Sequence, residues 1–222
     1  MKYCMTTILG LLFTFTAAFW SQALATETKS IADTKESILT GLEEKYANKG
    51  FSARFEQASK LTALDITETA TGKAWFSHPG KMRWQYEAPD THEIVTNGET
   101  LWIYRPQENQ VMHGSAAPFF QAGNGGAFLS DIRRIRNDFK IDLGKTGDNF
   151  AELVLMPKAE QPDLAKVLIT VDLPSHEIHL VVTENTYGDT TRFYFTNIHF
   201  NTPDARMFDF TIPEDVEIIE MN

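Results

Sequence analysis

The chain has 222 residues, of which 20 are Lys or Arg and 30 are Asp or Glu, giving a formal net charge of −10. An acidic surface repels phosphate backbones and anionic headgroups, so binding to nucleic acid, or to a membrane through a basic patch, is disfavoured. The single cysteine, Cys4, has no partner for an intramolecular disulfide, and the length suits one domain with a large core.

The first residues have the pattern of a secretory signal. Lys2 precedes an apolar run from Ile8 to Trp20, and Ala23-Leu24-Ala25 is a small-x-small cleavage site. The run is shorter than the roughly 20 residues of a bilayer-spanning helix, which favours cleavage over an uncleaved anchor. We therefore expect residues 1–25 to be a signal peptide and residues 26–222 to form a single exported domain without a lipid anchor.

The segment from Ser30 to Gly50 has the period of an amphipathic helix. Ile38, Leu42 and Tyr46 fall on one stripe, and Gly50 is placed to end the helix. We expect the apolar stripe to pack against a sheet and the charged side to face water.

From Phe51 onward the period changes to two. Met82, Trp84 and Tyr86, for example, alternate with polar residues. Turn signals such as Pro79-Gly80 recur every eight to twelve residues or so, which predicts about ten or eleven antiparallel strands joined as hairpins. The last of them is predicted as a short segment around Phe208–Ile212.

Several predicted strands are apolar on both faces, including Leu101–Tyr104, Leu153–Leu155 and Val167–Val171. Either both faces of the sheet are covered, or the sheet curls around an apolar interior. With only one long helix and one short helix available as cover, a curled sheet is the more economical fold. Its interior either holds an apolar ligand or is filled by its own side chains.

One region interrupts the strands. Gly114–Gly126 is rich in Gly and Ala around Phe119 and Phe120, and Ala127–Arg136 has the pattern of a short helix. Two interpretations stay open: a mobile lid over the interior, or a loop capped by a packing helix. Asp131 and the arginines that follow it indicate either local ion pairs or a basic docking spot for a partner.

No motif of catalysis is present. The sequence contains no Gly-x-Ser-x-Gly, no phosphate-binding loop and no His-Glu-x-x-His. His176 lies in a predicted turn between two strands, at Pro174–Glu177, and residues three apart on a strand, such as His176 and His179, point to opposite faces, so they are a poor pair of zinc ligands. We expect a protein that is not an enzyme and that needs no metal and no cofactor.

Four stretches in this order resemble the periplasmic outer-membrane lipoprotein carrier (LolA) family. They are the F-x-x-x-F-x-Q pattern of Phe51–Gln57, GKAWFSHPGKMRWQYEAP at 72–89, IVTNGETLWIYRP at 94–106 and FDFTIPEDVEII at 208–219. The resemblance implies a mostly β fold with α-helices, an unclosed antiparallel β-barrel in which an N-terminal helix and a short helical lid cover an apolar cavity.

The resemblance also implies a function. Members of this family work in the periplasm, where they accept lipoproteins from an inner-membrane ATP-driven release complex. They shield the acyl chains and pass the cargo to an outer-membrane receptor. A monomer is expected. The alternatives are a carrier of another acylated molecule, or a lipid- or lipoprotein-sensing module of the same fold, which would be expected to carry a further domain.

The sequence departs from the family at one turn, which the family usually writes R-P-G-K-F-R-W. The family's arginine is associated with closing the lid through hydrogen bonds to lid carbonyls. Here His78 takes its place, and Met82 replaces the phenylalanine. Because histidine has fewer donors, either Arg83 substitutes for the lid latch or the lid closes less firmly.

The candidate site follows from these patterns. The residues predicted to contact the cavity or form the lid are Phe55, Met82, Trp84, Trp102, Phe119, Phe120, Leu129 and Val154. The predicted lid latch consists of His78 with Arg83.

Overall fold

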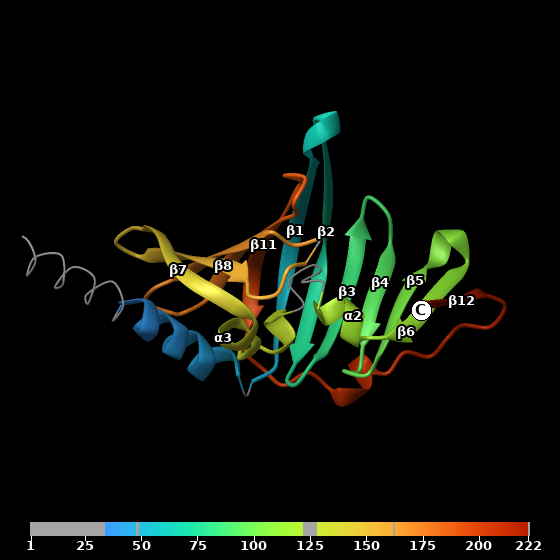
Figure 1. Ribbon diagram of the computed structural model, residues 1–222. Helices are drawn as coiled ribbons and strands as arrows, with labels where there is room; N and C mark the ends of the chain where they lie inside the picture. Colours follow the sequence, from blue (N-terminus) through green and yellow to red (C-terminus); the bar gives the residue numbers. More distant parts are fainter. Residues whose placement is uncertain (1–33, 48, 122–127, 162, 222) are drawn as a thin grey trace, which may run out of the picture.

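The computed structural model describes residues 34–47, 49–121, 128–161 and 163–221. The predicted signal peptide at 1–25 and the part of the predicted lid at 122–126 lie outside the described residues. The dominant element is one 12-stranded sheet (Figure 1). Its strands are β1 (Phe51–Leu61), β2 (Ile66–Ser77), β3 (Lys81–Ala88), β4 (His92–Thr96), β5 (Thr100–Arg105), β6 (Gln110–Ser115), β7 (Phe139–Thr146), β8 (Phe150–Pro157), β9 (Lys166–Asp172), β10 (Ile178–Glu184), β11 (Thr190–His199) and β12 (Glu217–Met221).

The sheet is unclosed and almost entirely antiparallel. Its order is β12-β6-β5-β4-β3-β2-β1-β11-β10-β9-β8-β7, so β7 and β12 are its edges. The predicted mostly β, unclosed fold is confirmed, with two differences. The final strand lies at Glu217–Met221 instead of Phe208–Ile212, and it pairs with β6 in parallel.

The remaining elements are helical and short. A helix spans residues 34–46, and a 3-10 turn spans 128–130. The others are α2 (Ala117–Gln121), α3 (Arg134–Asp138) and the 3-10 turns η1 (Thr62–Leu64), η2 (Pro106–Glu108) and η4 (Ala205–Phe208). Among the described residues, none of these helices is long and apolar enough to cross a bilayer.

The helix at 34–46 packs on the sheet as predicted. Leu42 is 1% exposed and belongs to the same buried cluster as the strands. Two contacts with the chain at β10 fix the helix: the Ile178 amide donates to the Tyr46 hydroxyl at 2.9 Å, and Lys45 pairs with Glu177 at 3.1 Å. Burial raises the pKa of Tyr46, so its hydroxyl stays neutral.

Strand pairing defines an inner and an outer face. Directly paired residues of antiparallel strands share a face, and successive residues alternate. Trp84 pairs with Ala74 and Ile94, and all three lie on the inner face. Arg83 pairs with Val95, which in turn pairs with Trp102, and these lie on the outer face.

The C-terminal segment covers part of the outer face. The ring of Phe210 lies 6.1 Å from Trp102 and 5.8 Å from Tyr104, and Phe208 is buried nearby. This cover explains why β5 is apolar on both sides. Residues 208–212 alternate like a strand, but their aromatic side chains pack on the sheet instead of pairing within it.

The lid region lies over the inner face. Residues of the 3-10 turn at 128–130 and of α3 join the main buried cluster, among them Leu129 and Ile135. Arg136 of α3 binds the helix at 34–46 through Glu36 and Glu43, at 2.8 and 2.5 Å. These hydrogen bonds raise the pKa of Arg136 and lower that of Glu36. The arginines of this region therefore form local ion pairs, which was the first of the two predicted interpretations.

Candidate functional site

The inner face carries a cluster of aromatic rings at the centre of the sheet. Trp84 of β3 lies 4.9 Å from Phe55, 5.5 Å from Phe76 and 5.1 Å from Phe193, measured between ring centroids. All four side chains are at most 2% exposed. They form the apolar floor of the candidate site, where edge-on ring contacts add to the stabilisation from burial.

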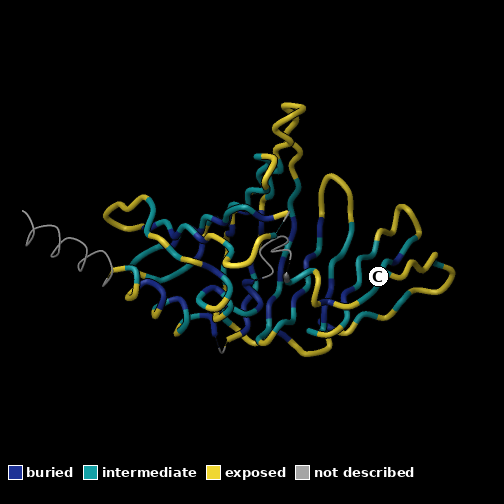
Figure 2. The backbone as a smooth tube through the Cα atoms, in the orientation of Figure 1, coloured by how far each residue is buried: buried dark blue, intermediate teal, exposed yellow. Residues whose placement is uncertain are grey.

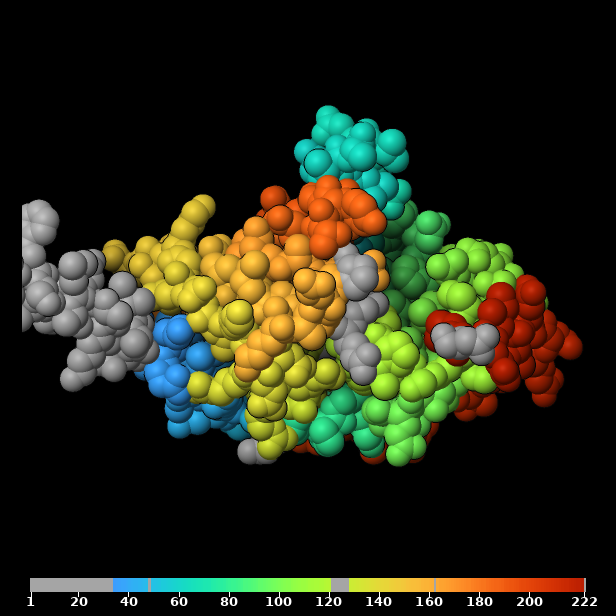
Figure 3. Space-filling view, in the orientation of Figure 1, coloured from blue at the N-terminus to red at the C-terminus, as the bar shows by residue number. Residues whose placement is uncertain are grey.

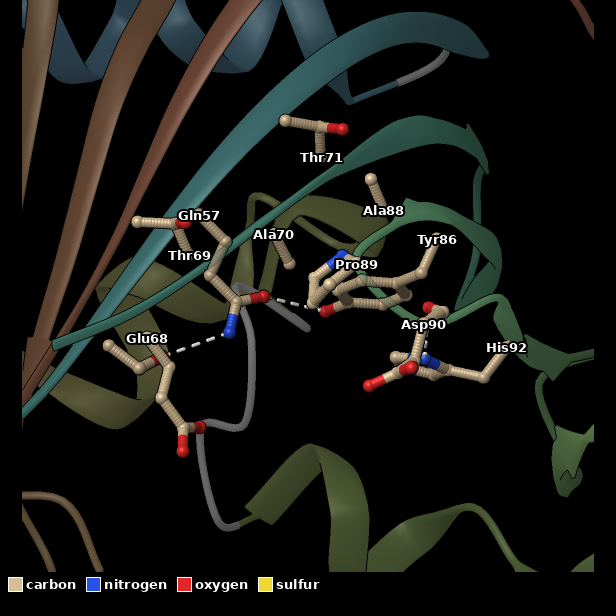
Figure 4. Close-up of a pocket in the computed structure, with 11 residues that line it drawn as sticks. Gln57, Glu68, Thr69, Ala70, Thr71, Tyr86, Ala88, Pro89, Asp90 and His92 are labelled. Carbon is tan, nitrogen blue, oxygen red and sulfur yellow. Dashed lines mark hydrogen bonds between the residues drawn. The ribbon is translucent and has the colours of Figure 1, made fainter. Parts of the chain in front are cut away.

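Two hollows open at the end of the sheet where the β1–β2 hairpin projects, and one of them reaches Phe193 of the floor. One of about 700 Å³ is lined by β1, β2, the end of β3, the turn after it and the start of β4 (Figure 4). The other, of about 350 Å³, includes Phe119 of α2, Ile94, Leu164 and Phe193. Both hollows share Gln57, Ser59 and Tyr86, so they meet along one wall.

That shared wall is polar. The Tyr86 hydroxyl donates to Gln57 Oε1 at 2.8 Å (Figure 4), and Gln57 Nε2 donates to Ser59 Oγ at 2.9 Å. Burial raises the pKa of Tyr86, which keeps the hydroxyl a neutral donor. The His92 ring stacks on Tyr86 at 3.9 Å, and burial lowers the pKa of His92. The wall thus offers uncharged hydrogen-bonding groups beside an apolar floor.

His78 links the sheet rim to the lid. Its Nδ1 lies 3.1 Å from the Ser130 carbonyl oxygen, which also accepts from the Gly80 amide at 3.1 Å. Gly80 has φ of +68°, a conformation that favours glycine and that presents this amide to the lid. Nε2 of His78 contacts the Arg133 guanidinium, and Asp131 lies 3.7 Å from Nδ1.

Arg83 does not reach the lid. It lies on the outer face, where it donates to the Met207 carbonyl at 3.1 Å and to Glu93 at 2.6 Å. The prediction that Arg83 substitutes for the latch is therefore wrong, because alternation along β3 turns Arg83 away from the side that holds Met82 and Trp84.

Two more predicted site residues lie away from the interior. Trp102 is on the outer face against Phe210, and Val154 alternates with the inward Leu153 and Leu155. Both predictions are corrected for the same reason. Each residue sits between apolar neighbours, so the sequence pattern does not reveal which way its side chain points.

The structure brings the other predicted residues together on the inner side. Phe55, Met82, Trp84 and Leu129 are buried in the main cluster, and Phe119 and Phe120 pack against it while partly exposed. Sequence reasoning missed Ile94 and Phe193. In β11, Phe193 and Phe195 alternate with Arg192, Tyr194 and Thr196. This alternation could have placed Phe193 and Phe195 on the inner face.

The inner face of the sheet and the lid enclose an apolar interior. Among the described residues, no three His, Cys, Asp or Glu side chains gather as a metal site requires. An apolar floor, a polar wall and a helical cover held at one rim are features typical of proteins that bind apolar ligands.

Comparison with known proteins identifies the family. Residues 47–211 match the family described as outer membrane lipoprotein carrier protein LolA, and the chain belongs to it. Its members are carriers, so the protein is not an enzyme.

Individual relatives agree with this assignment. The chain is 27% identical over 189 residues to an outer-membrane lipoprotein carrier protein of Cupriavidus taiwanensis, covering 85% of this chain and 87% of the relative. It is 27% identical over 183 residues to that of Pseudomonas paraeruginosa, covering 82% and 86%.

Two solved structures share the fold. An uncharacterized conserved protein from Thermus thermophilus has a TM-score of 0.55 at 10% identity, covering 85% of this chain and 99% of that one. MucB has a TM-score of 0.51 at 14% identity, covering 84% and 66%.

Proposed function

We propose that this protein carries lipoproteins through the periplasm by enclosing their acyl chains between the inner face of the sheet and the lid. The observation that carries the proposal is the aromatic floor of Phe55, Trp84 and Phe193, of which Phe193 lines the smaller hollow at the sheet mouth. In this scheme the cargo leaves an inner-membrane ATP-driven release complex and reaches an outer-membrane receptor. Residues 1–25 serve as the export signal.

The chemistry of the cargo explains why a carrier is needed. An acyl chain gains about 0.8 kcal/mol for each methylene removed from water, so it does not cross an aqueous compartment unprotected. The floor and the lid already pack against each other in one buried cluster. In this proposal the acyl chains therefore enter by the hollow lined by Phe119 and Phe193, and they advance as the lid moves off the floor.

The polar wall suits the other end of the cargo. Tyr86, Gln57 and Ser59 line both hollows at the mouth, where the acyl chains meet the polar glyceryl and peptide groups. The uncharged donors and acceptors of these three residues can satisfy ester and amide groups. Such neutral contacts orient the cargo without binding it tightly, so its release stays favourable.

The function is tested by incubating the purified protein with inner-membrane vesicles that contain the release complex, a labelled lipoprotein and ATP. We expect the labelled lipoprotein to appear in the soluble fraction bound to the protein in a 1:1 complex. A matched lipoprotein without acyl chains serves as the control and should not bind. If a family member of known activity extracts the cargo and this protein does not, the proposal is wrong.

A further inference from the structure

The β1–β2 hairpin ends in an exposed apolar tip. Leu61, Leu64 and Ile66 are 39, 66 and 46% exposed, and every residue from 60 to 69 is exposed. The hairpin projects well beyond the rest of the sheet (Figures 1 and 2). Three large aliphatic side chains held in water are unfavourable unless they have a partner.

A second turn adds an aromatic residue beside this tip. Thr62 donates from its amide to Asp189 at 2.8 Å and from its hydroxyl to the Gly188 carbonyl at 2.6 Å. These bonds tie the hairpin to the β10–β11 turn, where Tyr187 is 79% exposed. In the space-filling view this turn lies directly below the hairpin tip (Figure 3). We call Leu61, Leu64, Ile66 and Tyr187 the apolar tip.

The apolar tip stands at the mouth of the candidate site. The smaller hollow is lined by Leu61 from the hairpin and by Asn185 and Asp189 from the turn, and the larger one by Glu68. Whatever the tip contacts is therefore next to the opening through which a ligand enters.

The chemistry of the tip fits a lipid surface better than a protein. A stable protein interface buries about 800 Å² on each partner, and a narrow hairpin end offers little area of that kind. Leucine and isoleucine beside a tyrosine are the side chains that enter a membrane interface, where the aromatic ring sits at headgroup level. Lys60, the one basic residue of the sequence between positions 60 and 69, is paired with Asp65 at 3.1 Å, so the hairpin end itself adds little electrostatic attraction.

We propose that the apolar tip inserts reversibly into the interface of a lipid bilayer and so holds the mouth of the site against the membrane. The contact is hydrophobic. Glu68 and Asp189 below the tip and the net charge of −10 make it weaker on anionic than on zwitterionic lipid. This inference does not require the protein to carry a lipoprotein, because it rests on the tip residues alone.

The test is flotation of the purified protein with phosphatidylcholine vesicles in the absence of cargo. We expect the unaltered protein to float with the vesicles. The triple change Leu61→Ser, Leu64→Ser, Ile66→Ser should lower the partition coefficient by at least about tenfold. The matched control is Ile218→Ser with Ile219→Ser on β12, where the side chains are 53 and 36% exposed but lie at the sheet edge, and it should float unchanged.

A second measurement separates insertion from misfolding. An environment-sensitive dye on Leu64→Cys should shift to the blue on adding vesicles, whereas the same dye on Ile218→Cys should not. The inference is overturned if the unaltered protein stays with the buffer, if the triple and control variants lose flotation equally, or if vesicles rich in phosphatidylglycerol bind more strongly. A dye response that needs a membrane protein in the vesicles would also overturn it.

Discussion

Replacing Trp84 with alanine is expected to lower the free energy of unfolding by about 3–5 kcal/mol. Trp84 is 2% exposed and its ring contacts those of Phe55, Phe76 and Phe193, with Phe195 at 6.1 Å. Removing the indole leaves a cavity in the middle of the floor that these neighbouring rings only partly refill. Urea unfolding followed by far-ultraviolet circular dichroism measures the loss.

Trp102→Ala is the matched control for this change. The same side chain is removed, but from the outer face, where it is partly exposed and meets Phe210 at 6.1 Å. We expect a loss of about half that of Trp84→Ala, since less apolar surface returns to water. A larger loss at Trp102 would mean that the principal core lies on the outer face of the sheet.

Replacing His78 with alanine is expected to speed cargo release about fivefold. The change removes the contact between the imidazole and the buried lid carbonyl of Ser130, while the Gly80 amide still donates to it. One such hydrogen bond contributes roughly 1 kcal/mol, and a fivefold change in rate corresponds to about that energy. Transfer of a preloaded, labelled lipoprotein to an acceptor measures the rate.

His78→Arg tests the same latch in the opposite direction. Its guanidinium has more donors for lid carbonyls, so release should slow. The control is His113→Ala, because His113 pairs with Trp102 and lies on the outer face. Equal release rates for all four proteins would show that His78 is only a turn residue.

How far the sequence predicts this site depends on what flanks each residue. Met82 and Trp84 alternate with Arg83 and Gln85, so polar neighbours reveal their inward direction. Val154 stands between leucines, and only its pairing with Leu168 and Asp142 shows that it points outward. Alternation locates a face only when the opposite face is polar.

The sequence pattern does not predict contacts between residues far apart in the chain. His78 meets Ser130 across 52 positions, and Phe55 pairs with Phe195 at the join of β1 and β11. The turn pattern predicted hairpins between successive strands, and most of these formed, although β6 and β7 do not pair and a turn predicted at Thr71-Gly72 lies inside β2. The pairing of β12 with β6 was missed because a parallel edge strand leaves no local turn signal.

The measurement that most directly tests enclosure of acyl chains uses a lipoprotein whose acyl ends carry a diazirine. After loading and irradiation, residue-level mass spectrometry locates the crosslinks. We predict labels on inner-face residues at the mouth and floor, at Tyr86, Phe119 and Phe193 above all. Labels concentrated on Trp102 and Phe210, with the inner face unlabelled, would show that the acyl chains bind outside the curled sheet and would contradict the account.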